Sequence, residues 1–288
     1  MNQKKAFVVS LTSDFGPNQG GGLMEGIILS ISPHAQVIHL THDLPPFNLI
    51  AAARTLEQVA FLPVGTHVCI CDPGVWSDRK SLILETYRGD LLLGPDNGIL
   101  IPAARILGGI VKATTIENTK YIQRPTSQIF QGRDIYAPVA ANLANGVSFD
   151  EFGASIDVND LVGAVYDEAF VLENLLHATV IQISRFGSVH LNITYELWKK
   201  LELDHKDTIA IRRSHGESLC LPIGRTFSDV AKGEPIILKD DYGRIEMAIN
   251  MGSFAQAFNL KIGDSVVLDI NSDSHNYEKQ SWVLSFEI

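Results

Sequence analysis

Residues 66–79 read THVCICDPGVWSDR, and this stretch indicates how the first half of the chain folds. The short apolar and β-branched run THVCI leads to an acid, Asp72, at a Pro-Gly corner, as expected of a buried strand that ends at a turn. An arginine, Arg79, follows in the same segment. The stretch therefore predicts a strand whose carboxyl end presents a carboxylate, with a guanidinium close to it in the sequence.

Strand-like and helix-like patterns alternate from the N-terminus to about residue 150. Short β-branched runs such as AFVVSLTSDF and AQVIHLTH are separated by the helical patterns LMEGIILSIS and LIAAARTLEQVAFL. Near-continuous apolar strands with amphipathic helices between them are typical of a mostly parallel sheet that is covered on both faces. We therefore expect an α/β protein whose N-terminal domain, residues 1–160, is a mostly parallel α/β sandwich.

The pattern changes after about residue 177. Short strands with turn signals at close spacing take over, among them HATVIQISRFG, SVHLNIT, DTIAIRR and RIEMAINMG. Many short strands at such spacing are typical of a small antiparallel β domain, either a barrel or a sandwich. We expect residues 177–288 to form this second domain, joined to the first by a mixed, acidic linker at residues 161–176.

The composition limits the classes of function. With 33 acidic against 23 basic residues the formal charge is −10, and no Lys/Arg-rich run is present, which argues against nucleic acid and favours a small-molecule partner. No apolar run approaches the length of a membrane span, and the apolar stretch near the N-terminus is too short for a signal peptide. Of three cysteines, Cys69 and Cys71 alternate on a predicted strand and should both be buried, and the odd count suits a reducing compartment. A soluble cytoplasmic protein without a membrane partner is expected.

Polar side chains follow three predicted strands at the points where the strands end. Asp14 ends the first strand in TSDFG, His42, Asp43 and Phe47 lie at the end of the second in HLTHDLPPF, and Asp72 ends the third. In an open α/β sheet such residues point into the ligand crevice. Each acid alone could instead cap a helix or form a turn. Together with Arg79 and the GRD of QGRDIYAP, they favour a shared binding site.

A metal site is not predicted. His39 and His42 are three residues apart on a predicted strand, which would place them on opposite faces of the sheet. The stretch PNQGGGLMEG puts three glycines before a helix, but it lacks the dinucleotide fingerprint and a lysine of the Walker type. We expect these glycines to form a flexible loop on the substrate side rather than a phosphate site.

Six blocks, in order along the chain, carry a family resemblance. They are SDFG, THDLPPF, CDPGVWSDR, LGPDNG, QGRDIYAP and, far downstream, GRIEMAINMGS. The set resembles the S-adenosylmethionine hydrolase family, also called SAM hydroxide adenosyltransferases, which are relatives of the fluorinase and chlorinase. The resemblance runs over nearly the whole chain, and the DPGV, GPDNG and GRD blocks at these spacings are specific.

The resemblance implies an architecture and a reaction. The architecture is an N-terminal α/β domain followed by a C-terminal β-barrel, in a homotrimer whose active sites lie between the N-terminal domain of one subunit and the C-terminal domain of the next. The reaction is hydrolysis of S-adenosyl-L-methionine to adenosine and L-methionine, by attack of water or hydroxide at ribose C5′. No cofactor and no metal are expected, because a sulfonium loses its charge on leaving and needs no acid to assist it.

Within this resemblance, Asp14 is similar to the acid that binds both ribose hydroxyls, and Phe47 to the apolar wall over the sugar. Asp72 and Arg79 match two members of the family's Asp-Arg-His set that handles the attacking water, and the halogenases differ at the Asp72 position. The histidine of that set is Gln131 here, since the family's HGRD is written QGRD. A glutamine can donate to and accept from a water but cannot take its proton near neutral pH. The resemblance thus assigns Asp72, Arg79 and Gln131 to catalysis, with positioning of water as the expected role.

The second domain departs from the family at positions that would contact the ligand. SRFGS stands where the family usually has Asp-x-Phe-Gly-Asn, so Ser184 and Ser188 replace an acid for the methionine ammonium and an amide for adenine. KDDYG stands where the family usually has Asn-Ser-x-Gly, so Asp241 replaces a serine that helps to hold the methionine carboxylate, and its charge would oppose that group. The other residues expected to bind substrate are Phe186, Asn250 and Met251.

These departures leave three functions open. The chain hydrolyses S-adenosylmethionine, acts on a different 5′-substituted adenosine, or is a nucleoside-binding or structural trimer without turnover. An enzyme releases adenosine and methionine in proportion to time, whereas a binding module only gains thermal stability with its ligand.

Overall fold

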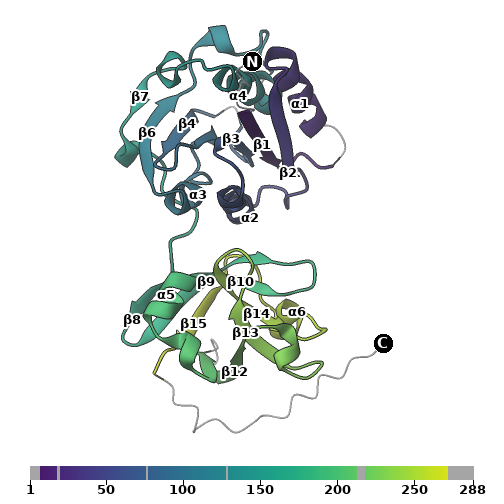
Figure 1. The fold of residues 1–288 in the computed structure, drawn as a ribbon, viewed down its shortest axis with the longest axis vertical. Helices are drawn as coiled ribbons and strands as arrows, with labels where there is room; N and C mark the ends of the chain where they lie inside the picture. Colours follow the sequence, from purple (N-terminus) through teal and green to yellow (C-terminus); the bar gives the residue numbers. More distant parts are fainter. Residues whose placement is uncertain (1–6, 18–19, 76, 128, 213–217, 272–288) are drawn as a thin grey trace, which may run out of the picture. The chain divides into compact units, whose positions relative to one another are not determined.

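The computed structural model describes residues 7–17, 20–75, 77–127, 129–212 and 218–271 (Figure 1). The chain divides into two compact units, with the boundary between Val165 and Tyr166. Each unit has its own sheet and its own hydrophobic core. The segment in which a linker is predicted includes a short strand, β8, and the start of β9.

The first unit is built on one sheet with a parallel and an antiparallel half. Among the described residues its seven strands follow the order β2-β1-β3-β5-β4-β6-β7. β2, β1, β3 and β5 are mutually parallel, and β4, β6 and β7 are added antiparallel. The strands span Phe7–Ser13 (β1), Ala35–Thr41 (β2), Gly65–Ile70 (β3), Ser81–Thr86 (β4), Leu91–Pro95 (β5), Ile110–Thr115 (β6) and Ser155–Ile156 (β7). The predicted parallel sheet is confirmed for the half that carries the strand ends of interest.

The antiparallel half of the sheet begins at β4 and β5, which are joined by a turn too short for a parallel crossover connection. The segment between β4 and β5 runs from Tyr87 to Asp90, and Gly89 adopts a φ of +95° within it. Glycine reaches this left-handed region without steric cost. A parallel connection needs about a dozen residues or more, so two strands joined by this short turn form a hairpin.

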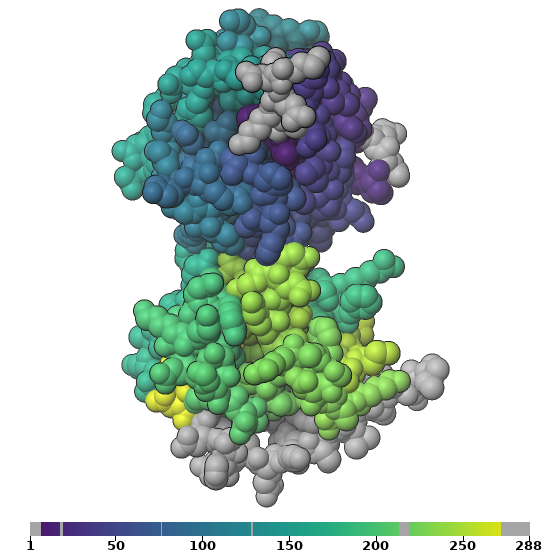
Figure 2. All heavy atoms as spheres, in the orientation of Figure 1, coloured from purple at the N-terminus to yellow at the C-terminus, as the bar shows by residue number. Residues whose placement is uncertain are grey.

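Helices cover both faces of this sheet, as predicted. α1 (Gly20–Ile31) and α4 (Ala137–Ala144) lie side by side on one face (Figure 1; Figure 2 draws all heavy atoms in the same orientation). α2 (Leu49–Leu56) and α3 (Ile101–Ile106) lie together on the other face. The strand ends that carry the predicted site residues are therefore held by a sheet packed on both sides.

The two faces of β3 enter different parts of the core. Val68 and Ile70 pack with residues of α1 and α4. Cys69 instead donates its thiol to the carbonyl of Ala52 on α2, at 3.8 Å. Cys69 and Cys71 are both fully buried, as predicted.

The glycines of PNQGGGLMEG are helical, which corrects the prediction of a flexible loop. Gly20, Gly21 and Gly22 are the first residues of α1. A Cβ at Gly20 would overlap the ring of Phe15, and one at Gly21 would overlap the ring of His42. The missing side chains let the start of the helix pack directly on the ends of β1 and β2.

The second unit is a closed barrel, which confirms the predicted architecture. In the part of the chain that the structure describes, seven strands follow the order β10-β14-β13-β12-β11-β15-β9, β9 pairs with β10 to close the ring, and β8 extends the sheet beyond β9. The strands span Phe170–Leu172 (β8), Leu175–Ile183 (β9), Val189–Thr194 (β10), Thr208–Arg212 (β11), Ser218–Gly224 (β12), Pro235–Lys239 (β13), Arg244–Ile249 (β14) and Ser265–Asp269 (β15). One pairing differs from the antiparallel prediction: β12 and β13 are parallel, because the connection at residues 225–234 brings the chain back along the barrel before β13 begins.

Helical segments of the second unit are short. α5 spans Tyr195–Lys200 and α6 spans Phe254–Phe258, and each begins with a side-chain cap, from Thr194 and Ser253 respectively. Across both units, 3₁₀ helices span Glu57–Phe61, Thr119–Tyr121, Phe149–Glu151, Val158–Asp160, Leu203–His205 and Phe227–Asp229, and a π-helical turn spans Gly132–Tyr136. No described helix combines the length and apolar character that crossing a bilayer would need.

Candidate active site

Asp14 lies just after β1, where its carboxylate joins three segments of the first unit. Its Oδ2 accepts hydrogen bonds from the backbone N–H of Phe47 (3.1 Å) and from the thiol of Cys71 (3.4 Å). Burial, and then the neighbouring Asp14 carboxylate, raise the pKa of the Cys71 thiol, so it stays protonated and remains a donor. The Phe47 side chain is 69% exposed on a backbone with φ +63°. The structure thus brings together the two residues predicted to contact the ribose.

A second cluster lies after β3. Arg79 donates to Oδ2 of Asp72 from Nε (2.7 Å) and from Nη2, and Nη2 also donates to Oε1 of Gln131 (2.7 Å). Oδ1 of Asp72 accepts the backbone N–H of Gly74 at 3.2 Å. The side chains of Asp72 and Arg79 are only 5% and 11% exposed. The three residues predicted for catalysis form one hydrogen-bonded group, in which Oδ1 of Asp72 keeps a lone pair for a water.

The guanidinium of Arg79 is held in its charged form. Burial by itself would lower the pKa of Arg79, but the hydrogen bond to Asp72 and the charge of that carboxylate outweigh burial, and the pKa is raised. Nη1 of Arg79 donates to the carbonyl of Lys80 (3.1 Å) and to the hydroxyl of Tyr136 (3.4 Å). A planar guanidinium with acceptors on several sides has little freedom to rotate, so it fixes the orientation of the carboxylate.

Tyr136 belongs to this cluster, although it was not predicted from the sequence. Its hydroxyl accepts from Arg79 and donates to Oγ of Ser81 at 3.0 Å. Burial raises the pKa of Tyr136 to about 12, so the phenol stays protonated. The π-helical turn connects Gln131, which precedes it, to Tyr136, its last residue, and such turns are frequent at functional sites. The only signal in the sequence was that Tyr136 falls inside the block QGRDIYAP.

The contact with Arg79 assigns the orientation of the Gln131 amide. Because a guanidinium is only a donor, the Gln131 atom that faces it is the carbonyl oxygen, and the Nε2 group carries the two remaining donors. This amide can donate a hydrogen bond to the oxygen of a water. It has no basic nitrogen with which to remove a proton, so the arrangement can position a water but lacks a strong general base at this point.

His39 and His42 contact each other, contrary to the prediction that they face opposite sides of the sheet. β2 ends at Thr41, and its register with β1 shifts near this end, so His42 leaves the alternation of the strand. Nδ1 of His39 lies 2.7 Å from Nε2 of His42. No group of three or more His, Cys, Asp or Glu side chains suited to a metal ion occurs among the described residues.

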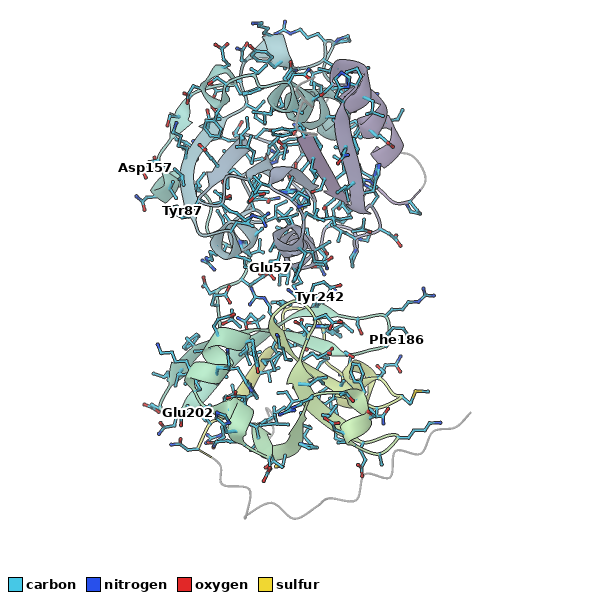
Figure 3. All side chains as sticks on the ribbon, viewed as in Figure 1. Glu57, Tyr87, Asp157, Phe186, Glu202 and Tyr242 are labelled. Atoms are coloured by element: carbon cyan, nitrogen blue, oxygen red, sulfur yellow. The ribbon has the colours of Figure 1, made fainter. Side chains whose placement is uncertain are left out.

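In the second unit, Ser184 and Ser188 close the turn between β9 and β10. The N–H of Ser184 donates to the carbonyl of Ser188 (2.9 Å), and the N–H of Ser188 donates to Oγ of Ser184 (3.1 Å). Phe186 projects from this turn and is 83% exposed (Figure 3). Gly187, at φ +85°, packs against Ser253 with no space for a side chain. The predicted contacts for adenine and methionine therefore belong to a hydrogen-bonded turn that carries an exposed aromatic ring.

The remaining predicted residues follow β13 and β14. Asp241 is exposed in the turn between these strands. Met251 is 78% exposed, with a φ of +59°. Asn250 uses its Nδ2 to donate to the carbonyl of Val230 (2.8 Å), so it also holds the segment that precedes β13. Asp241 and Met251 are thus presented to solvent, whereas Asn250 has a structural contact.

A buried charged cluster beside this turn was not predicted from the sequence. Nδ1 of His190 lies 3.0 Å from Oδ2 of Asp240, and its Nε2 lies 3.5 Å from Glu246. Burial raises the pKa of Glu246. Asp240 also accepts the backbone N–H of Tyr242 at 2.8 Å. The cluster therefore fixes the turn that presents Asp241.

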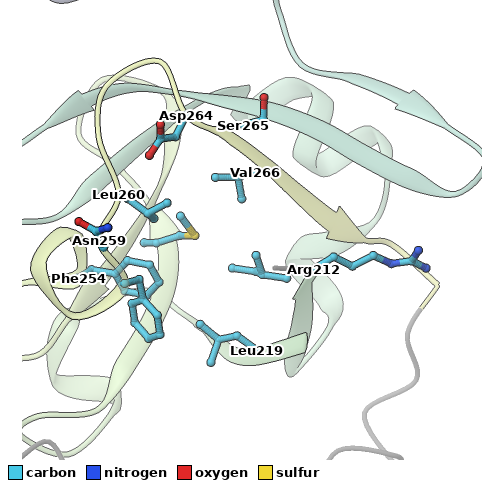
Figure 4. Close-up of a pocket in the computed structure, with 11 residues that line it drawn as sticks. Arg212, Leu219, Phe254, Asn259, Leu260, Asp264, Ser265 and Val266 are labelled. Atoms are coloured by element: carbon cyan, nitrogen blue, oxygen red, sulfur yellow. The ribbon is translucent and has the colours of Figure 1, made fainter. Parts of the chain in front are cut away.

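The second unit also contains a cavity of about 490 Å³ (Figure 4). Its walls are mixed: apolar side chains such as Leu219, Phe254, Leu260 and Val266 line it together with the polar residues Arg212, Asn259, Asp264 and Ser265. None of the lining residues within the described ranges is predicted to bind substrate. The cavity therefore shares no lining residue with the candidate active site defined above.

Two family models match the chain over most of its length. The model of the SAM hydroxide adenosyltransferase N-terminal domain matches residues 9–153, and the model of the SAM hydroxide adenosyltransferase C-terminal domain matches residues 178–267. The two matched ranges fall on the two units of the structure.

Comparison with individual proteins indicates the same family. An (R)-S-adenosyl-L-methionine hydrolase from Salinispora tropica is 31% identical over 262 residues, which cover 89% of this chain and 95% of the relative. A protein of the same name from Methanocaldococcus jannaschii is 32% identical over 272 residues, 90% of this chain and 94% of the relative. The crystal structure of an uncharacterized conserved protein from Thermotoga maritima is similar with a TM-score of 0.83 and 28% identity, over 91% of this chain and 99% of that chain. The chain therefore belongs to the SAM hydroxide adenosyltransferase family.

Proposed function

We propose that this chain hydrolyses S-adenosyl-L-methionine to adenosine and L-methionine, by attack of water or hydroxide at ribose C5′. The relatives from S. tropica and M. jannaschii are named as hydrolases of (R)-S-adenosyl-L-methionine. The observation that carries the proposal is the group formed by Asp72, Arg79 and Gln131, in which a nearly buried carboxylate is held in one orientation. The adjacent residue, Cys71, contacts Asp14, so the predicted water site and the predicted ribose site are neighbours.

The reaction requires a water in line with the bond from C5′ to sulfur. The water oxygen bonds to C5′, the C5′–S bond breaks, and its electron pair passes to sulfur, which leaves as the neutral thioether of methionine while one water proton is released. Oδ1 of Asp72 would accept a hydrogen bond from this water, and Nε2 of Gln131 would donate one to its oxygen. Holding a nucleophile in line can supply a large part of the rate enhancement without a strong base.

Recognition of the nucleoside is assigned to both units. Asp14 has two acceptor oxygens that suit the two ribose hydroxyls, and Phe47 offers a flat apolar surface for the sugar. The residues proposed to contact adenine and methionine are Ser184, Phe186, Ser188, Asp241, Asn250 and Met251. Neither a cofactor nor a metal is part of this proposal.

A homotrimer completes the proposal, with each site formed from the first unit of one subunit and the second unit of the next. The exposed side chains of Phe47, Phe186 and Met251 support it, because a ligand and a neighbouring subunit would cover them. Light scattering should give a mass of about three times the 31.6 kDa of the chain. A monomeric mass would contradict the shared site. We also propose a cytoplasmic location, which suits the free thiols of all three cysteines.

The experiment that tests the function is incubation of the purified protein with each sulfonium epimer of S-adenosyl-L-methionine. Adenosine and methionine are followed by chromatography over time. We expect equal amounts of both products, and none from the Asp72→Ala variant. Asp78→Ala is the matched control, because Asp78 is an exposed acid in the same loop, and it should retain activity. If neither epimer gives product above the Asp72→Ala background, the chain does not hydrolyse this substrate.

A different 5′-substituted adenosine is the second candidate substrate, and the exposed carboxylate of Asp241 favours it. An acid at a position assigned to the methionine carboxylate would repel that group and suit a neutral or cationic substituent. A thermal-shift series with adenosine derivatives would identify such a ligand, since a bound ligand stabilises the folded state by mass action. A derivative that raises Tm without being converted would indicate binding alone.

A further inference from the structure

A chain of four side chains runs from the end of β1 to the surface of the first unit. Oγ of Ser13 lies 2.7 Å from Nδ1 of His42, and Nε2 of His42 lies 2.7 Å from Nδ1 of His39. Nε2 of His39 lies 3.2 Å from Oε2 of Glu25 on α1. Ser13 is 1% exposed, whereas the side chains of His39 and Glu25 are 33% and 41% exposed. The four side chains therefore connect the buried hydroxyl of Ser13, next to Asp14, with solvent.

With neutral imidazoles, only one order of donors satisfies all three contacts. The Glu25 carboxylate can only accept, so Nε2 of His39 donates to it and Nδ1 of His39 accepts from Nε2 of His42. Nδ1 of His42 is then an acceptor for the hydroxyl of Ser13. Burial, followed by the nearby His39, lowers the pKa of His42 and so favours the neutral ring that this order requires.

These four side chains are not arranged for nucleophilic attack, although they include a serine, two histidines and an acid. A nucleophilic serine must reach its substrate, and Ser13 is buried with its Oγ also accepting the backbone N–H of Phe15 at 3.4 Å. The assignment of protons given above instead makes the Ser13 hydroxyl the donor and Nδ1 of His42 the acceptor. This arrangement suits a contact that holds two segments together.

The two segments, which follow β1 and β2, carry both predicted ribose contacts. The backbone N–H of Gly16 donates to the carbonyl of His42 (2.7 Å), and the N–H of Leu44 donates to the carbonyl of Ser13 (3.4 Å). Oδ2 of Asp14 then accepts the N–H of Phe47, whose left-handed backbone is disfavoured for an aromatic residue unless neighbouring contacts hold it. The His42 ring thus braces the base of the loop that sets the distance between the Asp14 carboxylate and Phe47.

The start of α1 is shaped to accept this ring. Gly21 lies against the His42 ring with no space for a Cβ, and the same helix supplies Glu25 at the far end of the row of four side chains. The ring is therefore held by Ser13 at the end of β1, by His39 on β2 and by the start of α1. Because the His42 ring makes directional hydrogen bonds through both nitrogens, it does more than fill the space between these elements.

We propose that His42 is a positioning residue for the nucleoside, which acts through Ser13 and through its backbone contacts to hold Asp14 and Phe47 in the geometry that binds the ribose. The inference rests on the proposed function for the identity of the ligand. It adds to that function a residue that touches neither the substrate nor the attacking water.

Steady-state kinetics of His42→Ala and His42→Asn test the proposal. Because positioning of the ribose affects binding more than the chemical step, His42→Ala should raise KM for S-adenosyl-L-methionine about 10-fold and change kcat less than about 3-fold. Asn retains an acceptor near the position of Nδ1 for Ser13, so His42→Asn should recover most of the affinity. His34→Ala is the matched control, because His34 is exposed in the same unit, and it should leave KM unchanged. Glu25→Ala, at the exposed end, should raise KM by only about 2-fold.

Binding of adenosine, measured by calorimetry, separates this proposal from the proposed function. If the wild-type protein binds adenosine without hydrolysing S-adenosylmethionine, the same ranking of variants should appear in Kd. Circular dichroism and Tm show whether each variant is folded, and His42→Asn provides the comparison if His42→Ala is not. A folded His42→Ala variant with wild-type KM and Kd, a folded His42→Asn variant whose KM or Kd is raised 10-fold or more, a loss confined to kcat, or a wild-type protein that does not bind adenosine would each overturn the proposal.

Discussion

The two units present their predicted site residues in different ways. In the first unit, Asp72, Arg79 and Gln131 are nearly buried and joined to one another by hydrogen bonds. In the second unit, Phe186 and Met251 are 83% and 78% exposed on turns. Groups that must orient a reacting water gain from being fixed before the ligand arrives, whereas groups that cover a ligand need to be accessible to it. Substitutions in the group formed by Asp72, Arg79 and Gln131 should therefore change kcat, and substitutions of the exposed residues of the second unit should change KM.

Asp72→Asn should have the largest effect. The substitution keeps the shape of the side chain but removes the charge that pairs with Arg79 and replaces one acceptor by a donor, so the water loses its orientation. We expect kcat to fall by about 100-fold, as for other displacements of a reacting group. Asp78→Asn is the matched control. A fall in kcat/KM caused by KM alone would break the comparison, since it would place Asp72 among the recognition residues.

Gln131→His should have the next largest effect and should act in the opposite direction. An imidazole can turn an unprotonated nitrogen toward the water and take its proton, which the amide cannot do, while Arg79 keeps its hydrogen bonds to Asp72. We expect kcat to rise by about 10-fold, at the low end of what proton transfer contributes. Single-turnover kinetics measure the chemical step directly. An unchanged rate would locate the limiting feature in the second unit, at Ser184, Ser188 or Asp241.

Phe186→Ala should have a smaller effect, confined to binding. Loss of an aromatic face from a ligand contact should raise KM by about 3- to 10-fold, with kcat nearly unchanged. Phe227→Ala is a suitable control, because Phe227 is an exposed aromatic residue elsewhere in the same unit. A change in kcat as large as the change in KM would contradict the division of roles between the Asp72 group and the exposed residues of the second unit.

The smallest effect expected is a pH dependence of stability that arises from His42. Its pKa is lowered in the folded state, by burial first and by His39 second, so the unfolded chain binds the proton more readily. The free energy of unfolding should therefore decrease as pH falls from about 6.5 towards the lowered pKa, and this contribution should be constant above that window. The groups that face the ring are Ser13, His39 and, beyond it, Glu25. Denaturant unfolding between pH 5 and pH 8 would measure the slope, which should be shallower in His42→Asn; an equal slope in both proteins would assign it to other groups.

Much of the fold could be predicted because it depends on local patterns. Runs of apolar residues separated by helical patterns indicated the parallel half of the first sheet, and closely spaced short strands indicated the β domain that closes into a barrel. The turn between β4 and β5 was not read as the start of an antiparallel half, because an apolar run has the same appearance in either orientation. The parallel pairing of β12 and β13 was missed for the same reason.

The candidate site could be predicted in part. The pair Asp72 and Arg79 lies within one short loop, so proximity in the sequence made their contact plausible before the structure was known. Tyr136 could not be found in this way, because it reaches Arg79 across 57 positions of the chain. The contact between His39 and His42 was missed because the strand ends one residue before His42, and the alternation rule holds only within a strand.

The amino-acid sequence by itself determined the order of strands and helices, the two-part organisation and the set of polar residues at the strand ends, because each follows from hydrophobic period, turn residues and charge over a few neighbouring positions. Only the tertiary structure decided that Tyr136 reaches Arg79, and that Gly21 packs on His42. Such contacts depend on where distant segments cross, and that is set by the packing of the whole unit rather than by any local pattern.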